Sequence, residues 1–132
     1  MSQENVRIAR LGYEAFNRGD VDGVLGLCDP DVEWEDVPSL DIPAAVGKDA
    51  VRAYFEAVMA AWERVHREPV EIIDLGGDRV LVLCNVTARG RGSGIEVDVR
   101  IGDLLTLRAG RVVCWTSYAS WARARKAAGL RE

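Results

Sequence analysis

The chain has 132 residues, of which 48% are hydrophobic and 29% charged, and its formal net charge is −4 at pH 7. This length predicts a single domain over residues 1–132, and the composition excludes disordered and collagen-like chains. The negative net charge argues against nucleic-acid binding, and no apolar run is long enough for a membrane span or a secretory signal. We therefore expect a soluble, cytoplasmic protein with neither nucleic acid nor membrane as a partner.

The first half of the chain combines helical patterns with one strand pattern. Three segments have the apolar spacing of helices, and these are residues 4–18, 21–27 and 47–64. Residues 32–36 alternate with a period of two, which predicts a strand with Asp36 on the same face as Val32 and Trp34. Two prolines in residues 37–46 favour a loop.

The second half of the chain changes to a period of two from Glu68 onward. Four segments are predicted strands, and these are residues 70–75, 79–88, 95–108 and 111–120. Glycine-containing turns separate them, and a short closing helix is expected to end at Gly129. Three helices followed by a strand meander indicate an α+β protein, with helices on one face of a mostly antiparallel sheet.

Two of the predicted strands are apolar on both faces, at residues 80–86 and 112–115. The helices of one chain cover only one face of a sheet, so a second copy is the simplest cover for the other face. We therefore expect a homodimer that packs through the outer faces of the sheet.

Each of two predicted strands carries an aspartate on its apolar face. Asp103 lies on the same strand face as Ile101 and Leu105. Asp36 likewise shares the apolar face of its own strand. A buried carboxylate is costly unless it is paired or stays protonated. The alternative is a bulge after Gly102 that turns Asp103 outward, with Asp36 at a strand end where it caps the following loop. The pattern alone leaves both interpretations open.

The other chemistry-bearing residues point to no cofactor. The three cysteines match no zinc spacing and are expected to be buried, reduced thiols, and they are Cys28, Cys84 and Cys114. The one histidine, His66, is expected at the end of a helix. The sequence has no glycine-rich phosphate loop and no metal-ligand cluster, so we expect neither a cofactor nor a metal.

Three segments carry a resemblance to a known family. They are FNRGDVDGVLGLCDPDVEWED at residues 16–36, GKDAVRAYFEAV at residues 47–58, and LRAGRVVCWTSY at residues 107–118. Together they resemble the SnoaL-like branch of the nuclear-transport-factor-two-like superfamily, over nearly the whole chain. The resemblance implies a cone, in which three N-terminal helices pack on a strongly curved, mostly antiparallel sheet that encloses a pocket. Members of the superfamily often dimerise through this sheet.

Within the superfamily, Glu35-Asp36 resembles the acidic pattern of the ketosteroid isomerases. The resemblance implies that Asp36 is the proton-shuttling base and that Asp103 is the protonated aspartic acid of the oxyanion hole. The tyrosine that these isomerases place on their first helix corresponds to Gly12. Tyr13 is the next residue, which is about 100° around the helix.

Three other branches of the superfamily can be compared at these positions. Limonene epoxide hydrolases place an arginine two residues before an aspartate, where this chain has Ile101, while Arg100 points to the other face. Scytalone-dehydratase-like sites use histidines, of which this chain has only His66. SnoaL-type polyketide cyclases use one aspartate in an apolar pocket, and Asp36 or Asp103 could supply it.

Two functions of different classes stay open. The first is a cofactor-independent isomerase or cyclase, in which one aspartate moves a proton on a small apolar carbonyl compound and the other stabilises the enolate. Its pocket wall would be aromatic, formed by Tyr13, Trp34, Tyr54, Phe55, Trp62 and Trp115. The alternative is a non-catalytic ligand-binding or dimerisation module, with Asp103 as a core residue whose hydrogen bonds are satisfied.

If Asp103 is a neutral acid, Asp103→Asn should keep the fold. The deciding observation is whether Asp36 and Asp103 face one open cavity.

Overall fold

The structure, a computed structural model, describes residues 2–37 and 43–130. The helices are α1 (Ser2–Asn17), α2 (Val21–Gly26), α3 (Lys48–Ala61) and α4 (Trp121–Ala127). The strands are β1 (Cys28–Glu35), β2 (Ala45–Val46), β3 (Trp62–Asp74), β4 (Arg79–Gly90), β5 (Glu96–Arg108) and β6 (Arg111–Tyr118). Within the loop expected at residues 37–46, residues 38–42 lie outside the described part and the last two residues form β2. No helix in the described ranges is long and apolar enough to cross a membrane.

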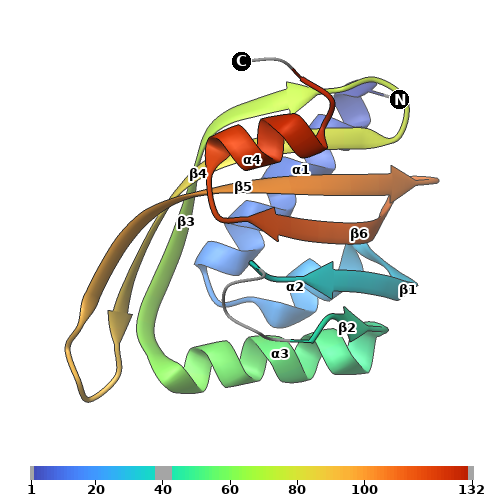
Figure 1. Ribbon diagram of the computed structural model, residues 1–132. Coiled ribbons are helices and arrows are strands. Elements are labelled where there is room, and N and C mark those ends of the chain that lie inside the picture. The colour runs from blue at the N-terminus through green and yellow to red at the C-terminus, as the bar shows by residue number, and fades with distance from the viewer. Residues whose placement is uncertain (1, 38–42, 131–132) are drawn as a thin grey trace.

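The six strands form one sheet in the order β2-β1-β6-β5-β4-β3. Strands β1 and β6 are parallel, and the other neighbouring pairs are antiparallel. Strands β3, β4 and β5 bend strongly, with α1 and α3 on the concave side of the sheet and α4 on the opposite side (Figure 1). The predicted α+β architecture, with helices packed on a curved and mostly antiparallel sheet, is therefore confirmed.

The start of β3 differs from the expectation. The third helix ends at Ala61 rather than near residue 64, and β3 begins at Trp62. His66 therefore lies within a strand and not at a helix end. Backbone pairing with β4 extends along the whole of β3, which outweighs the helical spacing of the preceding apolar residues. As a result, Val65 and Arg67 share one face of β3, opposite Ala88 and Val86 of β4.

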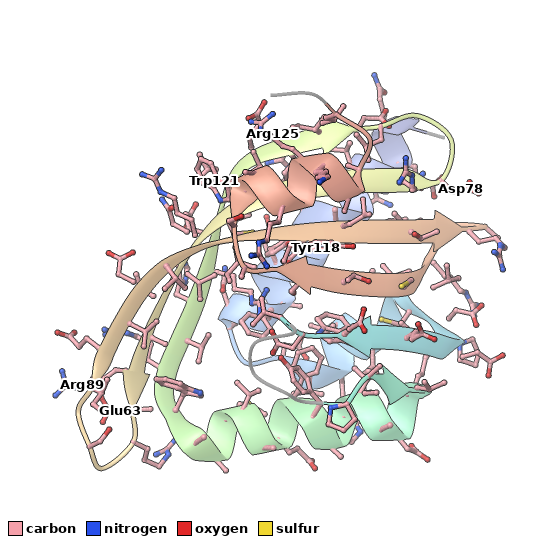
Figure 2. The ribbon with its side chains drawn as sticks, viewed as in Figure 1. Glu63, Asp78, Arg89, Tyr118, Trp121 and Arg125 are labelled. Carbon is pink, nitrogen blue, oxygen red and sulfur yellow. The ribbon has the colours of Figure 1, made fainter. Side chains whose placement is uncertain are left out.

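The first half of β4, residues 80–84, is buried on both faces, as the two-sided apolar pattern indicated. Val80 and Val82 face the main core beneath the N-terminal helices, whereas Leu81 and Leu83 pack with Ala124 of α4. Tyr118 and Trp121 lie on this outer side of the sheet and join the smaller core (Figure 2). Helix α4 of the same chain thus covers Leu81 and Leu83, in one of the two segments that motivated the expectation of a dimer. The homodimer stays a prediction.

An irregularity in β6 brings two side chains to the concave face. The pairing of β5 with β6 shifts between Thr106 and Leu107. Because of this shift, Val112 and Trp115 both enter the main core, although strict alternation put them on opposite faces. Ser117, two residues further along, is then also buried beneath the helices.

Gly102 is a packing site for α4 and not a bulge. The pairing of β4 with β5 runs without irregularity and places Gly102 opposite Leu83 and Asp103 opposite Val82. Asp103 therefore keeps the inward direction that alternation predicted, and the bulge alternative is wrong. A Cβ atom at Gly102 would lie 2.2 Å from the Cβ atom of Ala124, so the absence of a side chain lets α4 approach the sheet.

Replacing Gly102 with alanine is expected to lower the free energy of unfolding by about 1–3 kcal/mol, because the added methyl group forces α4 away from the sheet. Gly26→Ala is the matched control, since a Cβ atom there meets no atom within 4 Å. Urea unfolding followed by circular dichroism measures both variants. Equal unfolding midpoints for the two would contradict the packing of α4 against Gly102.

Candidate acid–base site

Asp103 is fully buried on the concave face of β5, with 0% of its surface exposed. Its carboxylate accepts a hydrogen bond of 2.5 Å from the Tyr13 hydroxyl and one of 2.6 Å from the Ser117 hydroxyl. Tyr13 comes from α1, and Ser117 lies directly opposite Asp103 on β6. The first helix and the last two strands thus meet at one carboxylate.

Arg67 of β3 completes this cluster with a buried ion pair. Its Nη1 lies 3.0 Å and 3.3 Å from the two carboxylate oxygens of Asp103, and its side chain is only 11% exposed. Asn17 fixes the Arg67 backbone through two hydrogen bonds of 2.8 Å, one to the N–H and one to the carbonyl. The guanidinium lies over the ring of Phe16, 5.5 Å from its centroid. Burial is the largest single effect and opposes the charge on Arg67, but the negative groups around the guanidinium, Asp103 first among them, together raise its pKa.

Asp103 acts only as an acceptor in its described hydrogen bonds. Tyr13, Ser117 and Arg67 donate to it, and the Cys84 thiol lies 3.9 Å from one oxygen. Burial and then the charge of Asp103 raise the pKa of Tyr13 well above its usual value, so this hydroxyl keeps its proton and donates. Such a ring of donors suits an ionised carboxylate. The expectation of a protonated, donating Asp103 did not include the buried arginine that supplies the compensating charge.

Asp36 forms a second, less buried carboxyl site with Tyr54. It lies just beyond the end of β1, which matches the alternative that it ends its strand and caps the following loop. The Tyr54 hydroxyl of α3 donates to one oxygen of Asp36, and the Val37 N–H donates to the other at 2.7 Å. Burial and then the charge of Asp36 raise the pKa of Tyr54 above its usual value. Tyr54 therefore stays a neutral hydrogen-bond donor around neutral pH.

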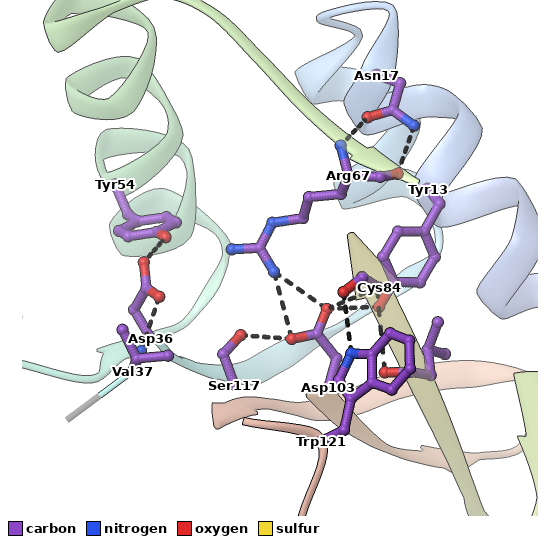
Figure 3. A network of polar contacts seen from close by, with 11 residues as sticks. Tyr13, Asn17, Asp36, Val37, Tyr54, Arg67, Cys84, Asp103, Ser117 and Trp121 are labelled. Atoms are coloured by element: carbon purple, nitrogen blue, oxygen red, sulfur yellow. Dashed lines mark hydrogen bonds and ion pairs between the residues drawn. The ribbon is translucent and has the colours of Figure 1, made fainter. Parts of the chain in front are cut away.

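Arg67 lies between the two carboxyl sites. Figure 3 shows its guanidinium with Asp103 on one side and the Asp36–Tyr54 pair on the other. The negative charges of Asp103 and, more weakly, Asp36 both raise its pKa, which places the two carboxylates within electrostatic reach of the guanidinium. The Nε atom of Arg67 is buried and has no hydrogen-bond partner in the described part of the chain. Arg67 thus contacts Asp103 directly, and Asp36 lies on the other side of its guanidinium without a described hydrogen bond to it.

The predicted aromatic wall is largely formed. Five of its six residues contact one another in pairs, and they are Tyr13, Trp34, Tyr54, Phe55 and Trp115. The rings of Trp34 and Trp115 stack with their centroids 4.3 Å apart. Trp62, at the start of β3, takes no part in these contacts, but it lines a cavity that Phe55 also lines. The role of the wall in substrate binding stays a prediction.

Tyr13, and not residue 12, directs its side chain toward the buried carboxylate. Gly12 faces the indole of Trp115, where a Cβ atom would lie 3.5 Å from the ring. A large side chain at this position would collide with Trp115, so the helix presents the next residue, Tyr13, to Asp103. The Tyr13 hydroxyl therefore takes the place of the tyrosine hydroxyl that the family resemblance put at Gly12.

Sequence reasoning missed Arg67 and Ser117. Arg67 lay between the expected helix at residues 47–64 and the period of two that was recognised from Glu68 onward, and only the early start of β3 places it on the concave face beside Val65. Ser117 faces inward because of the shifted pairing of β6. Residues 65–69, VHREP, show no alternation of apolar residues that could have marked this part of the strand.

A cavity of about 350 Å³ lies where the ends of α1 and α3 meet α2 and the start of β3. Phe55 and Trp62 line it, whereas Asp36 and Asp103 do not. The expectation that both aspartates face one open cavity thus stays a prediction. Among residues 2–37 and 43–130, no group of three or more metal-ligating side chains is placed to hold a metal ion.

Removing the charge of Asp103 is expected to destabilise the protein, because Arg67 would be left buried with an unpaired charge. We expect Asp103→Asn to lower the free energy of unfolding by about 3–5 kcal/mol, contrary to the expectation for a neutral acid. The double variant Arg67→Met/Asp103→Asn should regain part of this loss. Arg52→Gln is the control, since it breaks an exposed ion pair with Asp22 that contributes at most about 1 kcal/mol. Denaturant unfolding in which Asp103→Asn and Arg52→Gln share one midpoint would contradict the buried pair.

The free energy of unfolding is also expected to fall as the pH rises above about 9. Burial and then the charge of Asp103 raise the pKa of the Cys84 thiol from 9.0 to about 12, and burial raises that of Cys28 to about 11. The unfolded chain releases these protons first, so the stabilisation is complete below pH 9 and is lost toward pH 12. Unfolding midpoints between pH 8 and 11 should fall less steeply for Cys84→Ala than for the half-buried control Cys114→Ala. Identical slopes for the two variants would refute this assignment.

The SnoaL-like domain matches residues 9–115 of the chain. An NTF2-like protein of unknown function from Burkholderia pseudomallei is 25% identical with a TM-score of 0.82, over 93% of this chain and 95% of that one. A putative polyketide cyclase from Xanthomonas campestris is 21% identical with a TM-score of 0.79, over 92% and 94% of the two chains.

A hypothetical protein with a ketosteroid isomerase-like fold from Catenulispora acidiphila, solved in complex with trimethylamine, is 18% identical with a TM-score of 0.77. The match covers 94% of this chain and 93% of that one. No curated protein sequence matches the chain. The last two structures share the fold alone, whereas the domain match covers most of the sequence. The chain therefore belongs to the SnoaL-like family, and it has the NTF2-like, ketosteroid isomerase-like fold.

Proposed function

We propose that the protein is a cofactor-independent acid–base enzyme of the isomerase or cyclase type, acting on a small, largely apolar carbonyl compound. One observation carries the proposal. Asp36 is half-buried and accepts a hydrogen bond from neutral Tyr54, beside an arginine whose charge the fully buried Asp103 holds in place. This arrangement provides a base and a fixed positive charge within one apolar interior.

The two aspartates have different roles in this proposal. Asp103 has no exposed surface and receives bonds from three donors, so it is a positioning residue that anchors Arg67. Asp36 is half-buried, and its described hydrogen bonds come from the neutral Tyr54 hydroxyl and the Val37 N–H. A general base has to reach the substrate proton and needs a lone pair free to take it. Asp36 meets that requirement better than Asp103.

The proposed reaction begins when a carboxylate oxygen of Asp36 takes a proton from the carbon next to the substrate carbonyl. The electron pair of the broken C–H bond moves into the carbonyl group and gives an enolate. In this proposal Arg67 stabilises the negative oxygen, and the Tyr54 hydroxyl turns from Asp36 to the same oxygen once that carboxyl has taken the proton. Asp36 then returns the same proton to another carbon, so the reaction needs no further reactant.

Two buried donors support binding of an oxygen-bearing ligand in this interior. Arg67 Nε and Trp115 Nε1 are both buried without a hydrogen-bond partner among the described residues. A buried donor without a partner costs about 1–3 kcal/mol, and a ligand carbonyl or a water molecule would remove that cost. The stacked Trp34 and Trp115 rings provide the apolar surface beside these donors. The putative polyketide cyclase with the same fold is consistent with such a substrate class at the level of the fold.

A non-catalytic ligand-binding module is the second candidate function. The observation that favours it is the cavity of about 350 Å³, which neither aspartate lines. Under this alternative the Asp103 cluster only stabilises the fold, and Asp36 caps the loop after β1. The two candidates differ in whether Asp36 is needed for proton transfer.

The test is hydrogen–deuterium exchange at the carbon next to the carbonyl of 2-tetralone, followed by proton NMR in D₂O. The wild-type protein should accelerate exchange, Asp36→Asn should abolish the acceleration, and Tyr54→Phe should lower it by a factor of about 10²–10³. Glu35→Gln is the matched control, because Glu35 is the neighbouring carboxyl and is exposed at the end of β1. Wild-type exchange no faster than buffer, or full activity in a folded Asp36→Asn variant, would leave the binding module as the better candidate.

A further inference from the structure

The cavity of about 350 Å³ has the size and lining of a small-molecule site. Its apolar lining comes from α1, α2, α3 and the start of β3, and it includes Phe16, Val24, Phe55, Val58, Trp62 and Val65. Ligand sites in proteins have volumes of about 300–1,000 Å³ and a mostly apolar lining with a few polar groups. The cavity is therefore large enough for a compact molecule of roughly ten non-hydrogen atoms.

The two carboxylates at the rim of this cavity are already engaged. Asp20 accepts hydrogen bonds from the Gly23 N–H at 2.9 Å and from Arg18 at 3.3 Å, and the Gly23 bond is the main cause of its lowered pKa. Glu63 pairs with Arg89 at 3.3 Å, and both lie at the far end of the bent strands (Figure 2). Neither carboxylate is left to neutralise a further cation.

Two further arginines at the rim have no carboxylate partner in the described part of the chain. Arg91 donates to the carbonyls of Met59 and Trp62 at 3.0 Å and 3.2 Å, which fixes its guanidinium at the end of α3. Arg64 is exposed on β3 and also lines the cavity. The rim therefore presents an excess of positive charge beside an apolar interior.

We propose that this cavity binds a small amphipathic anion, a carboxylate on a short apolar chain. The chain would pack against Phe16, Phe55 and Trp62, and the carboxylate would lie at Arg64 with Arg91 beside it. Guanidinium groups bind carboxylates through paired hydrogen bonds, which matches the free donors at the rim. The site goes beyond the proposed proton-transfer function, since neither Asp36 nor Asp103 lines it.

Isothermal titration with octanoate tests the proposal, and 1-octanol is the neutral probe of the same chain length. Arg64→Gln should weaken octanoate binding about two- to fivefold, the effect of one exposed ion pair, and should leave 1-octanol binding unchanged. Arg108→Gln, at an exposed position at the end of β5, is the matched control and should change neither. Val58→Trp, which fills the cavity from α3, should weaken both probes at least tenfold while circular dichroism shows an unchanged fold.

Methyl NMR locates the probe independently of affinity. Octanoate should shift the methyl signals of Val58, Met59 and Val65, and Asp36→Asn should bind it as the wild type does. The proposal is overturned if octanoate does not bind, or if Arg64→Gln and Val58→Trp both bind it with wild-type affinity. Loss of octanoate binding in Asp36→Asn would also overturn it, because the probe would then occupy the acid–base site. Failure of the ketone exchange experiment has no bearing on these outcomes.

Discussion

The interior of this protein depends on the ion pair between Arg67 and Asp103. Removing two charges from water costs several kcal/mol for each ion, and an ion pair in the core persists only when further hydrogen bonds satisfy both groups. Tyr13 and Ser117 provide those bonds to the carboxylate, and Asn17 holds the arginine backbone. The pair thereby ties α1, β3, β5 and β6 to one point on the concave face, which a purely apolar core would not do with the same directional precision.

Helix α4 packs on the outer side of the sheet, directly opposite the Asp103 cluster. Gly102 precedes Asp103 and leaves the space that α4 fills, so the strand carries the polar cluster on one face and a helix on the other. Trp121 of α4 donates from its indole Nε1 to the Cys84 carbonyl at 3.0 Å. The Cys84 thiol lies on the concave face near Asp103. Packing of α4 is therefore coupled to β4, the strand that carries Cys84 next to Asp103.

The sequence predicted what depends on regular alternation and missed what depends on tertiary pairing. Asp103 was placed correctly because β4 and β5 pair without irregularity along their length. Ser117 was not, because the shift in β6 that turns it inward follows from packing against β5 and has no signature in the chain itself. Arg67 was missed because helical spacing of apolar residues continues to Trp62, and only pairing with β4 decides that the strand has already begun. Likewise, the choice between Gly12 and Tyr13 depends on the indole of Trp115.

Two aspartates in one interior are suited to different tasks because their partners differ in charge. A carboxylate that faces a guanidinium and two hydroxyls gains little by accepting a proton, since protonation would leave the cation unpaired. Asp36 faces a hydroxyl and a backbone N–H, so its protonation leaves no buried charge without a partner. Arg67 lies between the two and is held in place by its ion pair with Asp103 before any ligand arrives. Its charge is therefore fixed in position and needs no reorganisation when negative charge develops nearby, which is the condition under which electrostatic stabilisation of an enolate is most effective.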